Sequence, residues 1–385
     1  MEHKVVKKTE VKVEEAKSKK DRELQETKMS SEAELRNIVK PLVNWYRENK
    51  RDLPWRHNPD AYRVWVSEIM LQQTRVSAAL PYYERFLAAL PDIPALAGCE
   101  EEKLHKLWEG LGYYSRVRNL QKAAKIVCAQ YGGQLPADYN ALLALPGIGE
   151  YTAGAIASIS FGLPVPAVDG NVLRVFARLY NDPRLVTDPQ VKREFTARVM
   201  EHQPPAKAGD YNQALMELGA LVCLPNGVPL CEQCPLGTLC RARAAGTALS
   251  LPQKTPPKAR RITPVTVALV LNEGRVLLQQ RPAKGLLAGL WQPVLWEDTT
   301  LTAAETAARL AALGLDCTGA HFTPLPAAKH IFTHIEWHQS GYFLTVPEQP
   351  APAGCVWAGK EQLEAAYTLP GAFKVYKKLL LTKLL

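Results

Sequence analysis

The sequence has no run of 18 apolar residues, and its first residues are charged where a signal peptide would need an apolar core. We therefore expect neither membrane insertion nor secretion. It has only eight cysteines among 385 residues, too few for a disulfide scaffold. We find no internal repeat. These absences predict a soluble, intracellular protein.

The chain is basic and long enough for several domains. It has 47 Lys and Arg against 38 Asp and Glu, a net charge of +9. Such an excess is expected of a protein that meets polyanions. At about 150 residues per domain, the length predicts two or three domains.

Helical patterns dominate residues 31–222. The first 30 residues carry nine basic and seven acidic side chains and few large apolar ones, so we expect a disordered tail there. Ser31 and Glu34 could then form a capping box, and Pro41 predicts a kink or break in the helix that follows. Amphipathic spacing continues near residues 61–73, 76–90, 101–109, 115–130, 137–144, 150–161, 170–181, 188–202 and 207–222.

The character of the chain changes after residue 240. Residues 241–261 form a basic linker, since six basic residues and no acidic one occur between Gln233 and Asn272. Apolar residues then alternate from Val265 to Leu271, and a turn signal at residues 272–274 predicts a hairpin. Residues 301–313 read as helical, 330–346 as extended and 361–382 as helical. Residues 262–385 therefore predict a separate α+β domain.

Four cysteines lie close together in the loop of residues 223–240. They are separated by seven, two and five residues. Zinc and a four-iron four-sulfur cluster both accept four thiolates, and spacing alone slightly favours zinc. The sequence predicts a metal site made by Cys223, Cys231, Cys234 and Cys240.

A glycine-containing turn and an aspartate follow one another in the helical part. The turn Leu145-Pro146-Gly147-Ile148-Gly149 lies between two helical stretches, and Gly147 and Gly149 leave amides exposed that can bind a phosphate oxygen. Asp169 comes 20 residues later and is placed to cap the next helix. Capping and catalysis do not exclude each other.

These features resemble the helix-hairpin-helix DNA glycosylase superfamily, and several segments resemble its MutY-type adenine DNA glycosylases. The segments are Leu53–Arg56, Trp65–Thr74 with its Ser-Glu-Ile-Met-Leu-Gln-Gln-Thr run, Gly110–Arg116 and Asn212–Gly219. The resemblance covers residues 31–370. It implies an all-α helix-hairpin-helix glycosylase domain at 31–222, a [4Fe-4S] cluster loop at 223–240, and a linker to a C-terminal α+β Nudix-like domain. The family usually has six residues between the first two cysteines, where this chain has seven.

Adenine release needs a proton for the departing base and stabilisation of a cationic sugar, which suits two carboxyl groups with separated pKa values. Glu68 lies in an apolar stretch that would raise its pKa, and the resemblance implies that it protonates N7 of adenine. We expect Asp169 to be ionised at a helix N-terminus. The resemblance implies that it stabilises the oxocarbenium-like transition state or attacks the anomeric carbon. Asn171 would orient Asp169.

The position two after Gly149 distinguishes reaction types, because members that also cleave the strand have a Schiff-base lysine there. Here it is Tyr151, which implies a monofunctional enzyme that leaves an abasic site. The resemblance places an adenine pocket and two residues that wedge into the duplex. The pocket residues are Trp55, Arg56, Leu71 and Glu217, and the wedge residues are Gln73 and Tyr113.

The C-terminal domain resembles the lesion-reading domain of the family. Residues 329–334 match its reading segment, in which Phe332, Thr333 and His334 stand where Phe-Ser-His is usual. A hydrolytic Nudix enzyme needs clustered Glu and Arg on a helix, and residues 303–314 have only Glu305 and Arg309.

The resemblance implies a monomer that binds double-stranded DNA with adenine opposite 8-oxoguanine or, more weakly, guanine. In a bacterium we expect such a protein in the cytoplasm, associated with the nucleoid. The alternatives are a bifunctional glycosylase/lyase of the endonuclease III type, a non-catalytic damage sensor and a nucleotide pyrophosphohydrolase.

Overall fold

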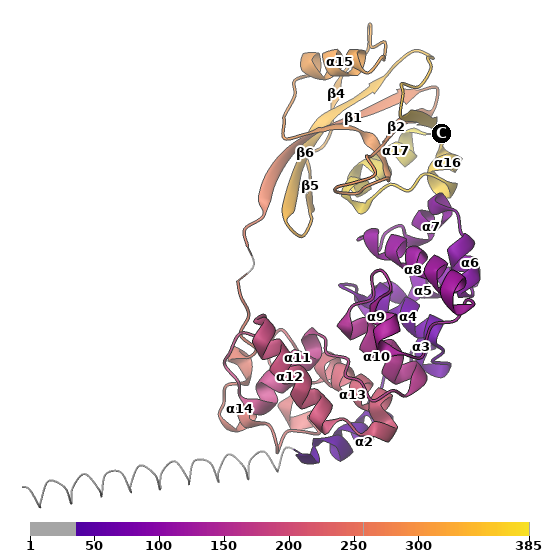
Figure 1. Cartoon of the computed structure of the whole chain (residues 1–385). Coiled ribbons are helices and arrows are strands. Elements are labelled where there is room, and N and C mark those ends of the chain that lie inside the picture. The colour runs from indigo at the N-terminus through magenta and orange to yellow at the C-terminus, as the bar shows by residue number, and fades with distance from the viewer. Residues whose placement is uncertain (1–35, 257, 385) are drawn as a thin grey trace, which may run out of the picture. The chain divides into compact units, whose positions relative to one another are not determined.

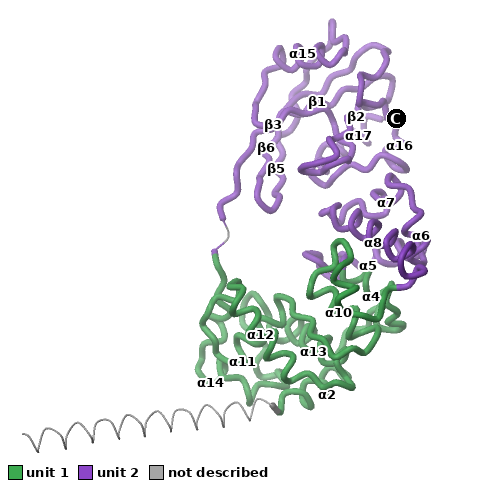
Figure 2. The backbone as a smooth tube through the Cα atoms, in the orientation of Figure 1, with its two compact units in different colours: residues 1–68, 135–255 green, residues 69–134, 256–385 purple. Residues whose placement is uncertain are grey.

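The structure is a computed structural model that describes residues 36–256 and 258–384. The predicted tail and the capping box of Ser31 and Glu34 lie outside these residues. The described chain forms two compact units, shown in two colours in Figure 2: residues 36–68 with 135–255, and residues 69–134 with 256–384. This division does not follow the domain boundaries predicted at 222, 240 and 261, which stay predictions. No helix in the described part is both long and apolar enough for a membrane span.

The first unit is helical. Its main core is formed by α2, α11, α12 and α13, with buried Tyr46, Phe176 and Phe195. The helices are α2 (Val39–Asn49), α3 (Pro54–His57), α4 (Ala61–Leu71, whose last three residues belong to the second unit), α9 (Tyr139–Leu143), α10 (Glu150–Phe161), α11 (Gly170–Tyr180), α12 (Pro189–His202), α13 (Ala208–Leu221) and α14 (Arg241–Ala244), with 3₁₀ turns η1 (Arg36–Ile38), η2 (Pro205–Lys207), η3 (Cys231–Gln233) and η4 (Ala248–Ser250).

The predicted interruption near Pro41 has a simple form. The chain changes from the 3₁₀ turn η1 to the α-helix α2 at Val39. Pro41 therefore falls in the first turn of α2, where the missing N–H has no intrahelical acceptor to lose.

The second unit begins with helices α5 (Val76–Ala89), α6 (Ile93–Gly98), α7 (Glu101–Trp108) and α8 (Ser115–Tyr131). Helix α6 was not predicted, because six residues are too few to show a helical period. Its sequence does carry a start signal: the side chain of Asp92 accepts a hydrogen bond from the backbone N–H of Ala95, and Pro94 lies in the first turn.

The rest of the second unit is a mixed seven-stranded sheet of order β4-β6-β1-β3-β2-β7, with β5 also paired to β6 (Figure 1). Strands β1 and β6 are parallel and the other pairs are antiparallel. Gly341 allows the parallel pair to approach closely, since a Cβ there would collide with the carbonyl of Val267. The strands are β1 (Arg261–Asn272), β2 (Arg275–Gln280), β3 (Trp291–Glu297), β4 (Thr323–Pro324), β5 (Ala328–Ile331), β6 (Ile335–Thr345) and β7 (Cys355–Ala358).

Alternation along β1 divides its side chains between two cores. Val265 and Val267 belong to a core that includes residues of α16 and α17, whereas Ala268 and Val270 belong to one that includes Leu310 of α15. The helices are α15 (Ala303–Ala312), α16 (Lys360–Ala365) and α17 (Lys374–Lys383), with 3₁₀ turn η5 (Gly371–Phe373). The continuous helix predicted for 361–382 is wrong, because the chain leaves the helical conformation before Pro370 and resumes it after η5.

Candidate active site

Glu68 is a buried acid held by a tyrosine. It lies near the end of α4 and is 7% exposed. The Tyr151 hydroxyl, from the first turn of α10, donates a hydrogen bond to Glu68 Oε2 at 2.6 Å. Burial raises the pKa of Glu68 to about 7, even though the Tyr151 hydrogen bond and Arg56 oppose this rise. The carboxyl group can therefore hold a proton near neutral pH.

Asp169 is held by hydrogen bonds at a helix N-terminus. It is the N-cap of α11, and its Oδ1 accepts from the backbone N–H groups of Asn171 at 2.9 Å and Val172 at 2.8 Å. The Asn171 side-chain amide donates to Oδ2 at 2.6 Å. Burial raises the Asp169 pKa, while these donors and Arg174 counteract it.

The charge of Asp169 acts on Glu68, and the two carboxyl groups accept different numbers of hydrogen bonds. The charge of Asp169 raises the pKa of Glu68 further. Asp169 accepts three hydrogen bonds and Glu68 accepts one, so a shared negative charge is better placed on Asp169. The arrangement favours a proton on Glu68 and a negative charge on Asp169.

Two glycines bring the Asp169 end of α11 against its neighbours. A Cβ on Gly154 of α10 would collide with the carbonyl of Pro166, three residues before Asp169. A Cβ on Gly219 of α13 would lie 2.6 Å from Cβ of Asn171. Close packing at both positions fixes the loop that presents Asp169.

Hydrogen bonds continue from Asn171 toward the cysteine loop. Arg174 donates to Asn171 Oδ1 and to the backbone carbonyls of Gly219 and Cys223, each at 2.8 Å. One turn later, Arg178 Nη1 lies 3.2 Å from Cys223 Sγ. Arg174 was not predicted, because its only signal in the sequence is the i+3 spacing from Asn171.

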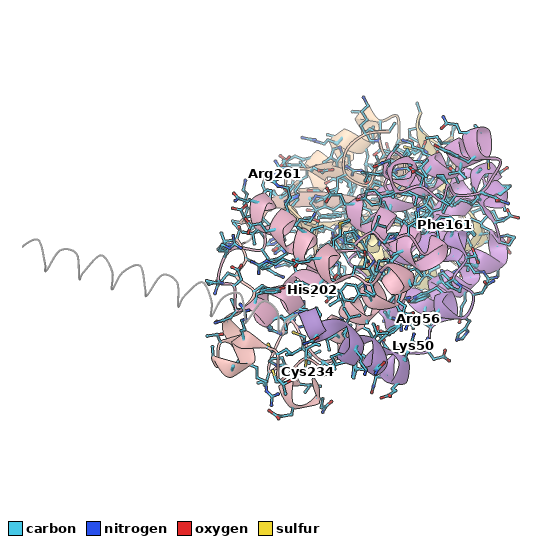
Figure 3. All side chains as sticks on the ribbon, turned by 60° about the horizontal axis from the view of Figure 1, so that its bottom comes forward. Lys50, Arg56, Phe161, His202, Cys234 and Arg261 are labelled. Carbon is cyan, nitrogen blue, oxygen red and sulfur yellow. The ribbon has the colours of Figure 1, made fainter. Side chains whose placement is uncertain are left out.

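Glu217 forms a buried ion-pair cluster with two arginines. Its side chain is 1% exposed, and both Arg56 and Arg51 donate to both of its carboxylate oxygens at 2.8–3.1 Å. Burial opposes the charge, but these hydrogen bonds lower the Glu217 pKa to about 2. Arg56 is labelled in Figure 3. Arg51 was missed, although it precedes the quoted Leu53–Arg56 segment by only two residues.

The glycine-containing turn has the features expected of a phosphate site. Gly147 and Gly149 are exposed, whereas Leu145 and Ile148 are buried and anchor the turn. Gly147 has φ +79°, and Gly149 is the N-cap of the 12-residue helix α10. Gly149 offers no side chain to cap the first amides of α10, which leaves them available to an anion.

The four loop cysteines line one cavity together with Arg178 and Arg243. All four are free, and Cys234 is labelled in Figure 3. Burial raises the Cys234 pKa, and the other three cysteines are near enough to raise it further. Within residues 36–256 and 258–384, no group of three or more Cys, His, Asp or Glu side chains is arranged to hold a metal ion.

Five further predicted residues, Gln73, Tyr113, Phe332, Thr333 and His334, lie in the second unit. Gln73 and Tyr113 are exposed and occupy turns at the ends of α4 and α7, respectively. Phe332, Thr333 and His334 form the tip of the β5–β6 hairpin, where Phe332 packs against Trp337 and the other two side chains are exposed. The Tyr113 hydroxyl lies 3.4 Å from Thr333 Oγ1, so the turn that contains Tyr113 contacts the tip of the β5–β6 hairpin.

The structure thus brings all four predicted catalytic residues together. Glu68, Tyr151, Asp169 and Asn171 form one electrostatically connected group, and Arg56 affects the Glu68 pKa within it. Trp55 is buried on α3 next to Arg56. Leu71, a predicted pocket residue, is the last residue of α4 and belongs to the second unit.

Comparisons with known proteins match both parts of the chain. Residues 66–201 match the HhH-GPD superfamily of base excision DNA repair proteins, and residues 266–379 match the NUDIX domain. The human adenine DNA glycosylase is 36% identical over 90% of this chain and 74% of its own length. The mouse adenine DNA glycosylase is 37% identical over 87% and 76%, respectively. A solved thermostable thymine-DNA glycosylase is 26% identical with a TM-score of 0.51, over 56% of this chain and 99% of its own.

Proposed function

Because this chain belongs to the adenine DNA glycosylases of the HhH-GPD base excision repair superfamily, we propose that it releases adenine mispaired with 8-oxoguanine, and more weakly with guanine. The chain is a DNA glycosylase, so the bond broken is the N-glycosidic bond. The observation that carries the proposal is a buried Glu68, whose pKa is raised to about 7 and which Tyr151 holds, together with an Asp169 carboxylate that accepts three hydrogen bonds.

Glu68 is the proton donor in this mechanism. Because the Tyr151 hydroxyl donates its hydrogen bond to Oε2, the proton that Glu68 delivers is on Oε1. Its transfer to N7 of adenine lets the base leave with the electron pair of the C1′–N9 bond. Asp169 then faces the positive sugar with a charge held by two backbone amides and Asn171, and water completes the hydrolysis.

Tyr151 also supports a monofunctional reaction. A phenol cannot form a Schiff base with the abasic sugar, so strand cleavage by that route has no nucleophile at this position. We expect borohydride to trap no covalent complex between the protein and its product DNA. Trapping would favour a glycosylase/lyase instead.

The turn at Gly147 and Gly149 would hold a phosphate of the DNA. Phe332, Thr333 and His334 would contact 8-oxoguanine, the base opposite the adenine. 8-Oxoguanine has an N7–H donor where guanine has an acceptor, and the exposed Thr333 hydroxyl can accept from it. Gln73 and Tyr113 would enter the duplex beside the lesion. Arg56, Glu217, Trp55 and Leu71 would enclose the extruded adenine.

A [4Fe-4S] cluster is the cofactor that we propose for the cysteine loop. Four thiols share one cavity, and the guanidinium of Arg178 lies beside Cys223 Sγ, which suits thiolate ligands of a negatively charged cluster. When bound, the cluster would crosslink Cys223, Cys231, Cys234 and Cys240 and stabilise the loop beside α11. Four irons per chain and a visible absorbance band would support this, whereas a colourless, zinc-loaded protein would contradict it and leave the glycosylase reaction untouched.

The catalytic part of the proposal is tested with two aspartates that both cap helix N-termini. Asp169→Asn should abolish adenine release from an A:8-oxoguanine duplex under single-turnover conditions. Asp188→Asn is the matched control, because Asp188 is also an N-cap and accepts from Gln190 N–H at 2.7 Å. Unchanged release by Asp169→Asn, or equal losses in both variants, would contradict a catalytic role for Asp169.

A further inference from the structure

The two wedge residues both occupy a strained backbone conformation. Gln73 has φ +59° and Tyr113 has φ +49°, although neither is glycine. Residues other than glycine rarely adopt this left-handed backbone conformation, and they keep it only where surrounding contacts hold it in place. Tyr113 is also 47% exposed, so burial of its own ring does not hold it there. Some other group must fix both turns.

Arg116, at the start of α8, contacts both turns at once. Its Nη1 donates to the carbonyls of Ile69 at 2.9 Å, Met70 at 3.1 Å and Gln72 at 2.5 Å. Its Nη2 donates to the carbonyls of Leu111 and Gly112, each at 3.2 Å. The first set ends α4 and leads into Gln73, and the second leads into Tyr113. One guanidinium therefore joins the two wedge turns.

Aromatic rings complete the enclosure of Arg116. Its guanidinium carbon lies 5.4 Å from the ring centroid of Trp108 and 5.4 Å from that of Tyr113. Trp108 Nε1 in turn donates to the Gly112 carbonyl at 3.1 Å. The guanidinium thus contacts carbonyl oxygens and aromatic rings, and burial lowers the pKa of Arg116 to about 10. A partly buried cation with such partners holds the backbone of the two turns in one conformation.

We propose that Arg116 is the positioning residue that sets the two duplex-inserting turns, and that Gln73 and Tyr113 enter the stack correctly only when both turns are tied to it. This inference rests on the wedge roles in the proposed function. The planar fork of an arginine can serve two turns in fixed directions, whereas the single ammonium of a lysine can serve one.

The test uses a wedge-dependent and a wedge-independent substrate. One duplex carries A:8-oxoguanine between paired neighbours, and the other has the same mispair between mismatched neighbours that are already unstacked. Arg116→Lys and Arg116→Met should slow single-turnover release from the paired duplex by tenfold to about a hundredfold. Both variants should stay within about threefold of the unsubstituted protein on the mismatched duplex, since the stack there no longer has to be opened.

The matched control is Arg118→Met, two residues along the same helix. Arg118 donates to the Ala288 carbonyl at 2.6 Å and is bonded to neither wedge turn, so this variant should behave like the unsubstituted protein on both duplexes. Equal losses of the Arg116 variants on both duplexes, or no loss on the paired one, would overturn the inference.

A fluorescence measurement separates this inference from the reaction itself. 2-Aminopurine placed beside the mispair brightens when it is unstacked, whether or not adenine is released. Brightening with the unsubstituted protein that the Arg116 variants lack supports the positioning role even if no adenine leaves. If the unsubstituted protein releases no adenine from either duplex, the proposed function fails. If the Arg116 variants brighten the probe normally, the inference fails.

Discussion

The Tyr151 hydroxyl should control the pH range of the reaction. It donates to Glu68 Oε2 at 2.6 Å and favours the charged form of a carboxyl group whose pKa burial raises to about 7. Because only protonated Glu68 can donate, adenine release should fall as pH rises through 7, to about a tenth of its plateau at pH 8. Tyr151→Phe removes a donor to the anion, so the Glu68 pKa should rise further.

The size of this rise follows from the hydrogen bond. A bond to a charged group contributes about 1.5 kcal/mol, and one pKa unit corresponds to about 1.4 kcal/mol. The Tyr151→Phe variant should therefore lose activity about one pH unit higher and keep about half of its own plateau rate at pH 8. Single-turnover rates between pH 5 and 9 measure this, with Tyr131→Phe, a substitution at an exposed ring of the second unit, as control. An unchanged or lower midpoint would refute the assignment of Glu68 as the acid held by Tyr151.

Three further predictions concern stability and specificity. Folding raises the Glu68 pKa, so the stabilisation that protonated Glu68 provides is complete below about pH 4.5 and is lost as pH rises through 7. The unfolding free energy of Glu68→Gln, compared with that of the unsubstituted protein, should therefore rise by about 3 kcal/mol from pH 4 to pH 8. A difference in melting that does not change with pH would contradict this. The Glu217 pKa is lowered because Arg51 and Arg56 bind its charged form, and Glu217→Gln leaves both arginines without their carboxylate. This variant should lose about 3 kcal/mol of unfolding free energy in urea at pH 7. Asp210→Asn, at the exposed Arg47–Asp210 pair, should lose less than about 1 kcal/mol, and equal losses would be inconsistent with a buried cluster. Thr333→Val removes the hydroxyl and should reduce the preference for 8-oxoguanine over guanine mispairs about tenfold, whereas Thr333→Ser should keep it. An unchanged preference in the valine variant would contradict a role of Thr333 in recognising the lesion.

Most helices could be located from the sequence because each carries its own period and caps. The predicted stretches at 150–161 and 188–202 nearly coincide with α10 and α12, whose N-termini are marked by Gly149 and Asp188. Local signals of this kind act within one turn of the helix and need no tertiary information. The break between α16 and α17 was missed because the apolar spacing continues across it.

The catalytic group could be predicted as residue types but not as a geometry. Glu68 and Asp169 are separated by about a hundred residues, and only folding places Tyr151 and Asn171 against them. The arginines at 51, 116 and 174 were not assigned roles, because their principal acceptors are backbone carbonyls or a distant glutamate. No sequence pattern marks a carbonyl as an acceptor for a side chain that far away.

The measurement that tests the central claim most directly is single-turnover release of adenine from duplexes with adenine opposite 8-oxoguanine, guanine or thymine, with strand breaks scored before and after alkali. We predict rapid release from the 8-oxoguanine mispair, slower release from the guanine mispair, none from the thymine pair, and breaks only after alkali. Tight binding without release from any duplex would contradict the catalytic roles of Glu68 and Asp169, and breaks before alkali would contradict the role given to Tyr151.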